Sequence, residues 1–85
     1  MAEVLVGNIT HYYTRIGVAV VELTDVLKRG DPIHIKGATT DFEQEVKSMQ
    51  IEHGAVEQAE PGRAIGLKVD QRVREGDTVY KIVED

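Results

Sequence analysis

Cysteine is absent from this 85-residue chain, and so is tryptophan. Without cysteine the chain can form neither a disulfide framework nor a thiolate metal site, and thiol catalysis is excluded. A reducing compartment is the default for such a sequence. Only three Tyr and one Phe are present, so the core must be packed mainly by Val, Ile, Leu and Ala.

Long apolar runs are missing as well. No segment approaches the roughly 20 apolar residues that a membrane-spanning helix needs. The residues Met1–Val6 have neither the basic start nor the long apolar stretch of a secretory signal. We therefore expect a cytoplasmic protein that makes no contact with a membrane.

The sequence also lacks the usual signatures of catalysis. Ser48 is the single serine and does not lie in a GxSxG motif. The eight glycines form neither GxGxxG nor GxxxxGK[ST], which excludes nucleotide binding by these two routes. The three histidines, His11, His34 and His53, do not have the HxxxH spacing of paired metal ligands. We expect no enzyme activity, no cofactor and no metal site.

What the chain does contain is an uneven distribution of negative charge. The net charge is −5, and the segment 41–60 accounts for all of it. This segment contains six acidic residues and one basic residue, Lys47. Such a run is typical of a solvated strand face. It also disfavours contact with a phosphate backbone, because nucleic-acid binding depends on Lys and Arg.

One sequence plan occurs twice, at Leu27–Lys36 and at Val73–Ile82. In both copies an apolar residue precedes two further residues, then Gly-Asp, then alternating apolar and polar residues. This pattern is typical of a turn whose glycine has positive φ and which leads into a strand. We expect structural turns at Gly30-Asp31 and Gly76-Asp77, and an internal pseudo-repeat in an all-β fold.

The segment Ile16–Leu23 is apolar on both alternating faces and rich in β-branched residues, which favours a strand over a helix. A strand that is buried on one side only does not need two apolar faces. Its outer face is expected to lie under another part of this chain or against a partner protein, and the sequence leaves both possibilities open.

Alternation of apolar and polar residues predicts five further strands. They are expected at Val4–Tyr12, Ile33–Lys36, Asp41–His53, Ile65–Val69 and Val79–Val83. The apolar phase changes within two of these strands, at Gly7 and near Lys47-Ser48, which predicts β-bulges. Gly54–Glu60 is expected to be a loop or a short helical turn.

Six strands with short connections and two bulges predict a small, closed Greek-key β-barrel. At 85 residues the chain is long enough for one domain, so residues 1–85 are expected to form it alone.

Several motifs, in this order and spacing, cover nearly the whole chain. They are Gly7–Thr10, Ile16–Leu23, Leu27–Gly37, Val46–Gln50, Ala59–Gly62, Gly66-Leu67 and Val73–Val79. In this arrangement the chain resembles the second domain of translational GTPases such as elongation factor Tu. It resembles more closely the C-terminal barrel of collagenase-type peptidases, where Thr39–Phe42 and Ile51–His53 also fit.

The resemblance implies a translation-factor type of β-barrel that acts as a stand-alone binding module. It implies neither GTP hydrolysis nor proteolysis, because the chain contains neither the nucleotide-binding domain of the GTPases nor the catalytic portion of the peptidases. A peptidase-like chain is one partner that the resemblance suggests.

Our first functional hypothesis is a module that binds a protein partner through Ile16, Val18 and Val20. The alternative is an RNA-binding module that acts in translation on tRNA or the ribosome. Its contacts would come from basic residues near the two turns and from two tyrosines that could stack on bases. These residues are Lys28, Arg29, Arg72 and Arg74, with Tyr12 and Tyr13.

Overall fold

The computed structural model describes residues 2–52 and 54–84 of the chain, and its regular secondary structure is all β. No stretch within those two ranges forms a helix that could cross a lipid bilayer. The described residues contain ten strands, which follow one another along the sequence. They are β1 (Ala2–Tyr13), β2 (Val18–Leu23), β3 (Leu27–Lys28), β4 (Pro32–Lys36), β5 (Asp41–Glu45), β6 (Met49–Ile51), β7 (Gly54–Val56), β8 (Gln58–Ala59), β9 (Ala64–Lys68) and β10 (Thr78–Val83).

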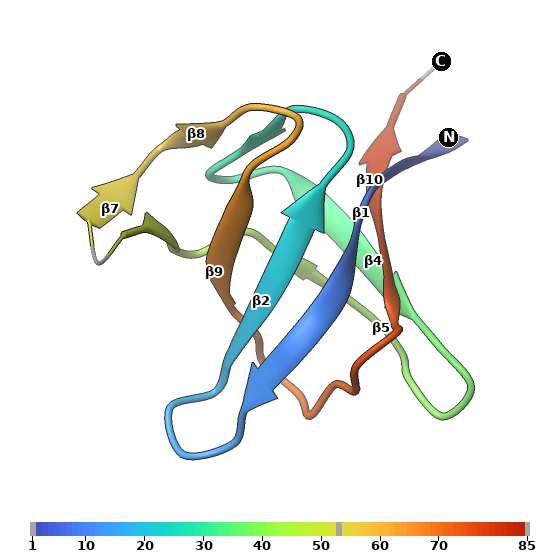
Figure 1. Cartoon of the computed structure of the whole chain (residues 1–85). Helices are drawn as coiled ribbons and strands as arrows, with labels where there is room; N and C mark the ends of the chain where they lie inside the picture. Colours follow the sequence, from blue (N-terminus) through green and yellow to red (C-terminus); the bar gives the residue numbers. More distant parts are fainter. Residues whose placement is uncertain (1, 53, 85) are drawn as a thin grey trace.

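Eight strands form one strongly curved antiparallel sheet in the order β5-β4-β10-β1-β2-β9-β6-β7 (Figure 1). The long β1 is central because it pairs with β10 along its first half and with β2 along its second half. The remaining strands, β3 and β8, form a separate two-stranded sheet.

The prediction of a closed six-stranded barrel is wrong in two respects. The main sheet is open, because its edge strands β5 and β7 do not pair with each other, and the described ranges contain ten strands in place of six. The turn after β3 lies in the gap, which we call the seam. There the N–H of Arg29 donates to the carbonyl of Glu57 at 2.8 Å, and the N–H of Gly30 donates to that of Val46 at 2.9 Å. Isolated hydrogen bonds therefore replace a continuous ladder.

The additional strands are too short to show a sequence period. β3 and β8 have two residues each and β7 has three, whereas alternation needs about four residues to be recognised. Consequently the expected loop or helical turn at Gly54–Glu60 is in fact β7 and β8. The long strand expected at Asp41–His53 is divided into β5 and β6, and His53 itself lies outside the described residues.

The side chains of the core come from the inner face of every long strand, as the alternation predicted. Ile65, Leu67 and Val69 are all buried, and so are Val46 and Met49. The last two residues are an odd number of positions apart, but residues 46–48 lie between β5 and β6 and belong to neither strand, so the β-bulge predicted at Lys47-Ser48 is instead a break between two strands. The predicted bulge at Gly7 is confirmed, since the β1–β10 register shifts between Leu5 and Gly7.

The two Gly-Asp turns, which we call corners, have matching geometry. Gly30 and Gly76 have φ angles of 93° and 91°, in the left-handed region expected of both glycines. In each corner the aspartate carboxylate accepts a hydrogen bond from the backbone N–H three residues earlier. The backbone of each corner also exchanges two hydrogen bonds with one residue elsewhere, Val46 for the first corner and Ile9 for the second. The repeat in the sequence is therefore a repeat in structure.

Candidate functional site

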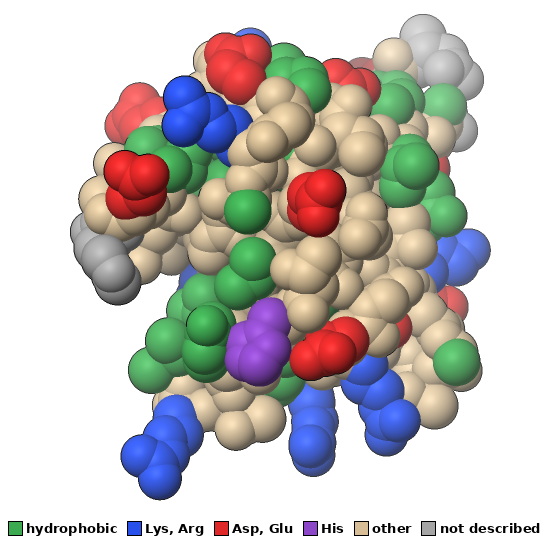
Figure 2. Space-filling view, in the orientation of Figure 1, with side chains coloured by type: hydrophobic (Ala, Val, Ile, Leu, Met, Phe, Trp, Pro, Cys, Tyr) green, Lys and Arg blue, Asp and Glu red, His purple; other side chains and the backbone are tan. Residues whose placement is uncertain are grey.

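A hollow of about 410 Å³ lies on the outer face of the sheet, over β2, β9 and β6. Its lining, which we call the outer groove, is Tyr13, Ile16, Val18, Val20, Gln50, Glu52, Ala64, Ile65 and Gly66. Hydrophobic side chains gather over the hairpin end of β1 and β2 in Figure 2, beside a histidine. Apolar side chains thus make up much of the lining of the outer groove.

The wall of the outer groove on the β2 side is apolar and exposed. Ile16 is 57% exposed and Tyr13 is 49% exposed, and both belong to the β1–β2 hairpin. Val18 and Val20 are half-buried on the outward side of β2, whereas Ala19 and Val21 point into the core. The sequence alone assigned Ile16 to the strand, but it lies in the turn that precedes β2.

The floor of the outer groove follows from the pairing of three strands. Val20 on β2 is opposite Gly66 on β9, and Gly66 is opposite Gln50 on β6. These three residues form a row across the strands. Because Gly66 has no side chain, only backbone atoms form the floor of the groove between the side chains of Val20 and Gln50. A Cβ atom at position 66 would lie 3.3 Å from the Cγ1 of Val18, which is tight but not a clash.

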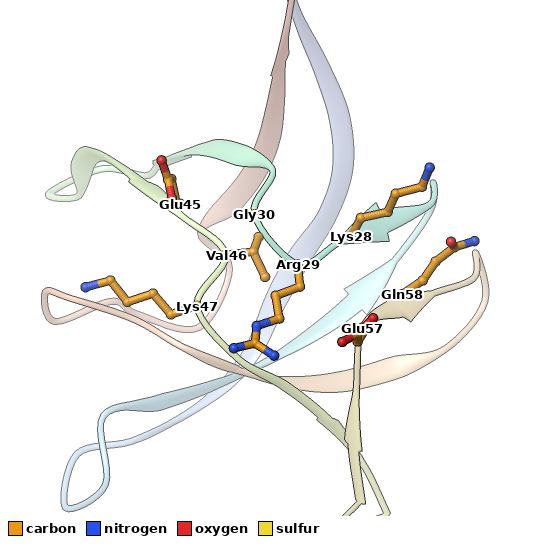
Figure 3. Close-up of a pocket in the computed structure, with 8 residues that line it drawn as sticks. All are labelled: Lys28, Arg29, Gly30, Glu45, Val46, Lys47, Glu57 and Gln58. Carbon is orange, nitrogen blue, oxygen red and sulfur yellow. The ribbon is translucent and has the colours of Figure 1, made fainter.

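A second hollow, of about 730 Å³, lies at the seam (Figure 3). This charged cleft is lined by Lys28, Arg29, Gly30, Glu45, Val46, Lys47, Glu57 and Gln58. In Figure 3 its charged side chains point in different directions and not toward a common centre. The Nζ of Lys47 is engaged outside the cleft by the carboxylate of Asp70, at 2.6 Å. The cleft combines three positive and two negative side chains, so it does not select one sign of charge.

A histidine bound by two carboxylates connects three strands in the other half of the sheet. The Nδ1 of His34 on β4 lies 2.7 Å from Oε2 of Glu3 on β1, and its Nε2 contacts Oδ1 of Asp41 on β5. The hydrogen bonds to Asp41 and then to Glu3 raise the pKa of His34 above its ordinary value of 6.5. The same bond to His34 lowers the pKa of Asp41. Both ring nitrogens of His34 are used here, which suits a structural role.

The basic residues of the RNA hypothesis do not all line one hollow. Lys28 and Arg29 line the charged cleft, whereas Arg72 and Arg74 belong to the loop before the second corner and are not among the residues of that cleft. Tyr12 packs against the core and Tyr13 lies at the outer groove. No group of three His, Cys, Asp or Glu side chains with the geometry of a metal site occurs in the part of the chain that is described.

Sequence reasoning found one wall of the outer groove and missed the rest. The sequence did not predict that Gln50, Glu52 and Gly66 lie beside Val20, because their proximity depends on the register of β2, β9 and β6. The nearest signal in the sequence is a glycine in the middle of a predicted strand, which often marks a place where another group approaches the backbone.

Two comparisons of sequence connect the chain to peptidases, although no protein-family model matches it. It is 45% identical over 83 residues to an uncharacterized protease of Methanocaldococcus jannaschii, and 36% identical over 81 residues to a collagenase of Porphyromonas gingivalis. The alignments cover 96% and 93% of this chain. They cover only 20% of either relative, so the chain spans about a fifth of the curated relatives' length.

The fold agrees with that of a solved domain. The C-terminal domain of a candidate U32 peptidase from Geobacillus thermoleovorans superposes with a TM-score of 0.87, covering 93% of this chain and 92% of that one. A selenomethionine form of the same domain gives a TM-score of 0.84. At 21% and 19% sequence identity, these superpositions establish the fold alone.

These findings correct the functional expectation. The relatives are named as a protease and a collagenase, so the expected role as a translation elongation factor-like module, with RNA binding as its alternative, is wrong. The resemblance to collagenase-type peptidases is confirmed, and the link to the second domain of elongation factor Tu is not shown.

Proposed function

We propose that this chain is a peptidase-associated domain that packs against the catalytic portion of a U32-type peptidase. One observation carries the proposal. The chain matches a protein named as a protease at 45% identity over nearly its whole length, yet accounts for only 20% of that protein. In such a relative the equivalent domain is joined to a portion four times its size, which is the nearest available surface for it to contact.

In this proposal the outer groove is the contact surface and residues 1–85 act as a single folded unit. Ile16, Val18 and Val20 present apolar side chains to solvent on the outward side of one hairpin. Removing apolar surface from water contributes about 25 cal/mol per Å². A large part of this contribution would come from Ile16, because it is the most exposed large hydrophobic residue described.

Peptide-bond cleavage is assigned to the remaining portion of the peptidase. Serine is represented in this chain by Ser48 alone, and the described histidines are engaged with carboxylates: His34 with Glu3 and Asp41, and His11 with Glu75 at 3.4 Å. The partner expected for this chain is thus peptidase-like, and its contribution is to support that partner and not to perform the chemistry.

The test is a chimera in which this chain replaces the matching 81-residue segment of the Porphyromonas gingivalis collagenase. Gelatin cleavage is compared among the parent enzyme, the chimera and a variant that lacks the segment. We expect the chimera to retain cleavage and the deletion variant to lose it. Cleavage by the deletion variant at the parent's rate would overturn the proposal, since the domain would then be dispensable.

The contact surface is tested by a matched pair of substitutions in the chimera. Ile16→Ser and Leu5→Ser each remove one exposed large hydrophobic side chain, 57% and 49% exposed, from different parts of the surface. We expect Ile16→Ser to reduce cleavage and Leu5→Ser to leave it unchanged. The reverse result would assign the contact to the surface around Leu5.

A further inference from the structure

The glycine in the middle of the outer groove, Gly66, is not required by the backbone conformation. Its effect is to leave space where a side chain would otherwise lie. The glycines with positive φ are Gly17, Gly30, Gly62 and Gly76, so Gly66 has a backbone that any residue could adopt. A glycine within a strand weakens it, because it has no side chain to pack. The consequence on this surface is a slot above Gly66, bounded by Val20 on one side and Gln50 on the other.

The two sides of the slot differ in chemistry. On the β2 side, Val18, Val20 and Ile16 offer only carbon atoms. The loop that carries Ile16 is held in place, since the Nζ of Lys68 donates to the Ile16 carbonyl at 2.7 Å. On the β6 side, Gln50 and Glu52 are exposed and bring an amide and a carboxylate to the rim.

The charge at the outer groove is one-sided, because Glu52 is the single charged side chain in its lining. Segment 41–60, which contributes Gln50 and Glu52 to the rim, has one base. Its one base, Lys47, is paired with Asp70 at 2.6 Å and does not line the outer groove. A partner that covers this rim is therefore favoured if it brings positive charge.

We propose that the slot above Gly66 receives an apolar side chain of the peptidase's catalytic portion, with a basic residue beside it that faces Glu52. This rests on the proposed function and adds the chemistry of the partner's contact. An apolar anchor seated in a pocket at the centre of an interface, with a polar rim around it, is the arrangement that concentrates binding energy. The volume of about 410 Å³ leaves room for the anchor and its neighbour.

The experiment uses Gly66→Ala, which raises the floor of the slot by one methyl group. Gly54→Ala on β7 is the matched control, because a Cβ at that position would lie 3.4 Å from the Ile51 carbonyl, an ordinary contact. Both substitutions are made in the free chain and in the collagenase chimera. Hydrogen exchange followed by mass spectrometry then measures the protection of peptides from this 85-residue chain, both in the free chain and in the chimera. Protection in the free chain reports the intrinsic stability of the domain, and the additional protection in the chimera reports docking.

We expect wild-type peptides to be more protected in the chimera than in the free chain. Gly66→Ala should remove the larger part of this gain, whereas Gly54→Ala should preserve it. Equal gains for wild type and Gly66→Ala would overturn the inference. If the chimera still cleaves gelatin in that case, the proposed function stands and only the slot is wrong.

The basic neighbour is tested by Glu52→Gln, with Glu57→Gln, an exposed acidic residue of the charged cleft, as its control. The wild-type gain in protection should shrink as salt is raised, and Glu52→Gln should abolish this salt dependence while Glu57→Gln keeps it. Unchanged salt dependence in Glu52→Gln would contradict the basic neighbour.

Two other occupants of the slot are distinguished with the free chain. Sedimentation across a concentration series detects a second copy of this chain, and titration with a collagen-like peptide detects a substrate segment. Either interaction, if weakened by Gly66→Ala and not by Gly54→Ala, would assign the slot to that occupant and overturn the proposal.

Discussion

His34 is the residue whose chemistry is most sensitive to its surroundings. Its side chain is 12% exposed and contacts Asp41 on the neighbouring strand β5 and Glu3 on β1, which lies beyond β10 in the sheet. Glu43 and Tyr80 occupy the paired positions on β5 and β10, and Lys36 lies near Asp41. When the ring is protonated both nitrogens can donate, and the charged ring then joins β1, β4 and β5.

We predict that this cluster makes stability depend on pH. The pKa of His34 is raised on folding, so its contribution is complete below about 6.5 and is lost as pH rises through the folded pKa. The pKa of Asp41 is lowered, so its contribution is present above about 3.8 and is lost as pH falls through the folded value. The cluster should therefore stabilise most between these two limits.

Urea unfolding at a series of pH values measures this effect. His34→Gln should flatten the decline in stability above neutral pH. The double variant with Asp41→Asn should lose less than the two single losses combined, because both substitutions remove the same interaction. An unaltered pH profile in His34→Gln would contradict the assignment.

At the scale of elements, the two corners are the repeated unit of the fold. Each places a glycine in the left-handed conformation and directs the following strand, β4 or β10, into the sheet. β4 and β10 then pair with each other, Ile35 opposite Val79. The corners thus set the direction of two adjacent strands of the eight-stranded sheet.

We predict equal costs for alanine at the two corner glycines. Nothing lies within 4 Å of a Cβ at Gly30 or Gly76, so only the backbone conformation opposes the substitution. The left-handed conformation costs a residue with a Cβ about 1–2 kcal/mol. Gly30→Ala and Gly76→Ala should each lower the free energy of unfolding by this amount in urea titrations. If the losses in unfolding free energy for the two variants differ by more than about 1 kcal/mol, the width of that range, the two corners are not equivalent.

The short elements explain where sequence interpretation was accurate and where it was not. The corners were predictable because Gly-Asp requires little more than local backbone geometry. β3, β7 and β8 were not, because ladders of two or three residues arise from neighbours that are distant in the sequence, such as Leu27 opposite Ala59. The same limitation concealed Gly66, which becomes part of a site only through Val20 and Gln50.

At the scale of the whole molecule, the seam is the place where the sheet is incomplete. The strands around β1 and β2 are held on both sides by continuous ladders. Across the seam, the connection consists of isolated bonds such as those of Arg29 and Gly30, beside the solvent-accessible charged cleft. Opening of the molecule should therefore begin there.

We predict slower hydrogen exchange in the central strands than at the seam. The backbone amides of Val21 and Leu67 should exchange only through global unfolding, whereas those of Arg29 and Gly30 should exchange through local opening. NMR exchange rates measured at increasing urea concentrations distinguish the two routes, since only global unfolding depends steeply on urea. If the exchange rate of the Arg29 amide depends steeply on urea concentration, the seam opens only when the whole molecule unfolds.

The sequence by itself determined the all-β class, the inward residues of the long strands, the bulge at Gly7 and the two corners. These features follow from side-chain alternation and from the backbone preferences of glycine, both of which are local. Only the tertiary structure decided that the cylinder stays open at the seam and that Val20, Gly66 and Gln50 form one row. Those outcomes depend on the register between distant strands, which is set by packing of the whole core and leaves no periodic trace in the sequence.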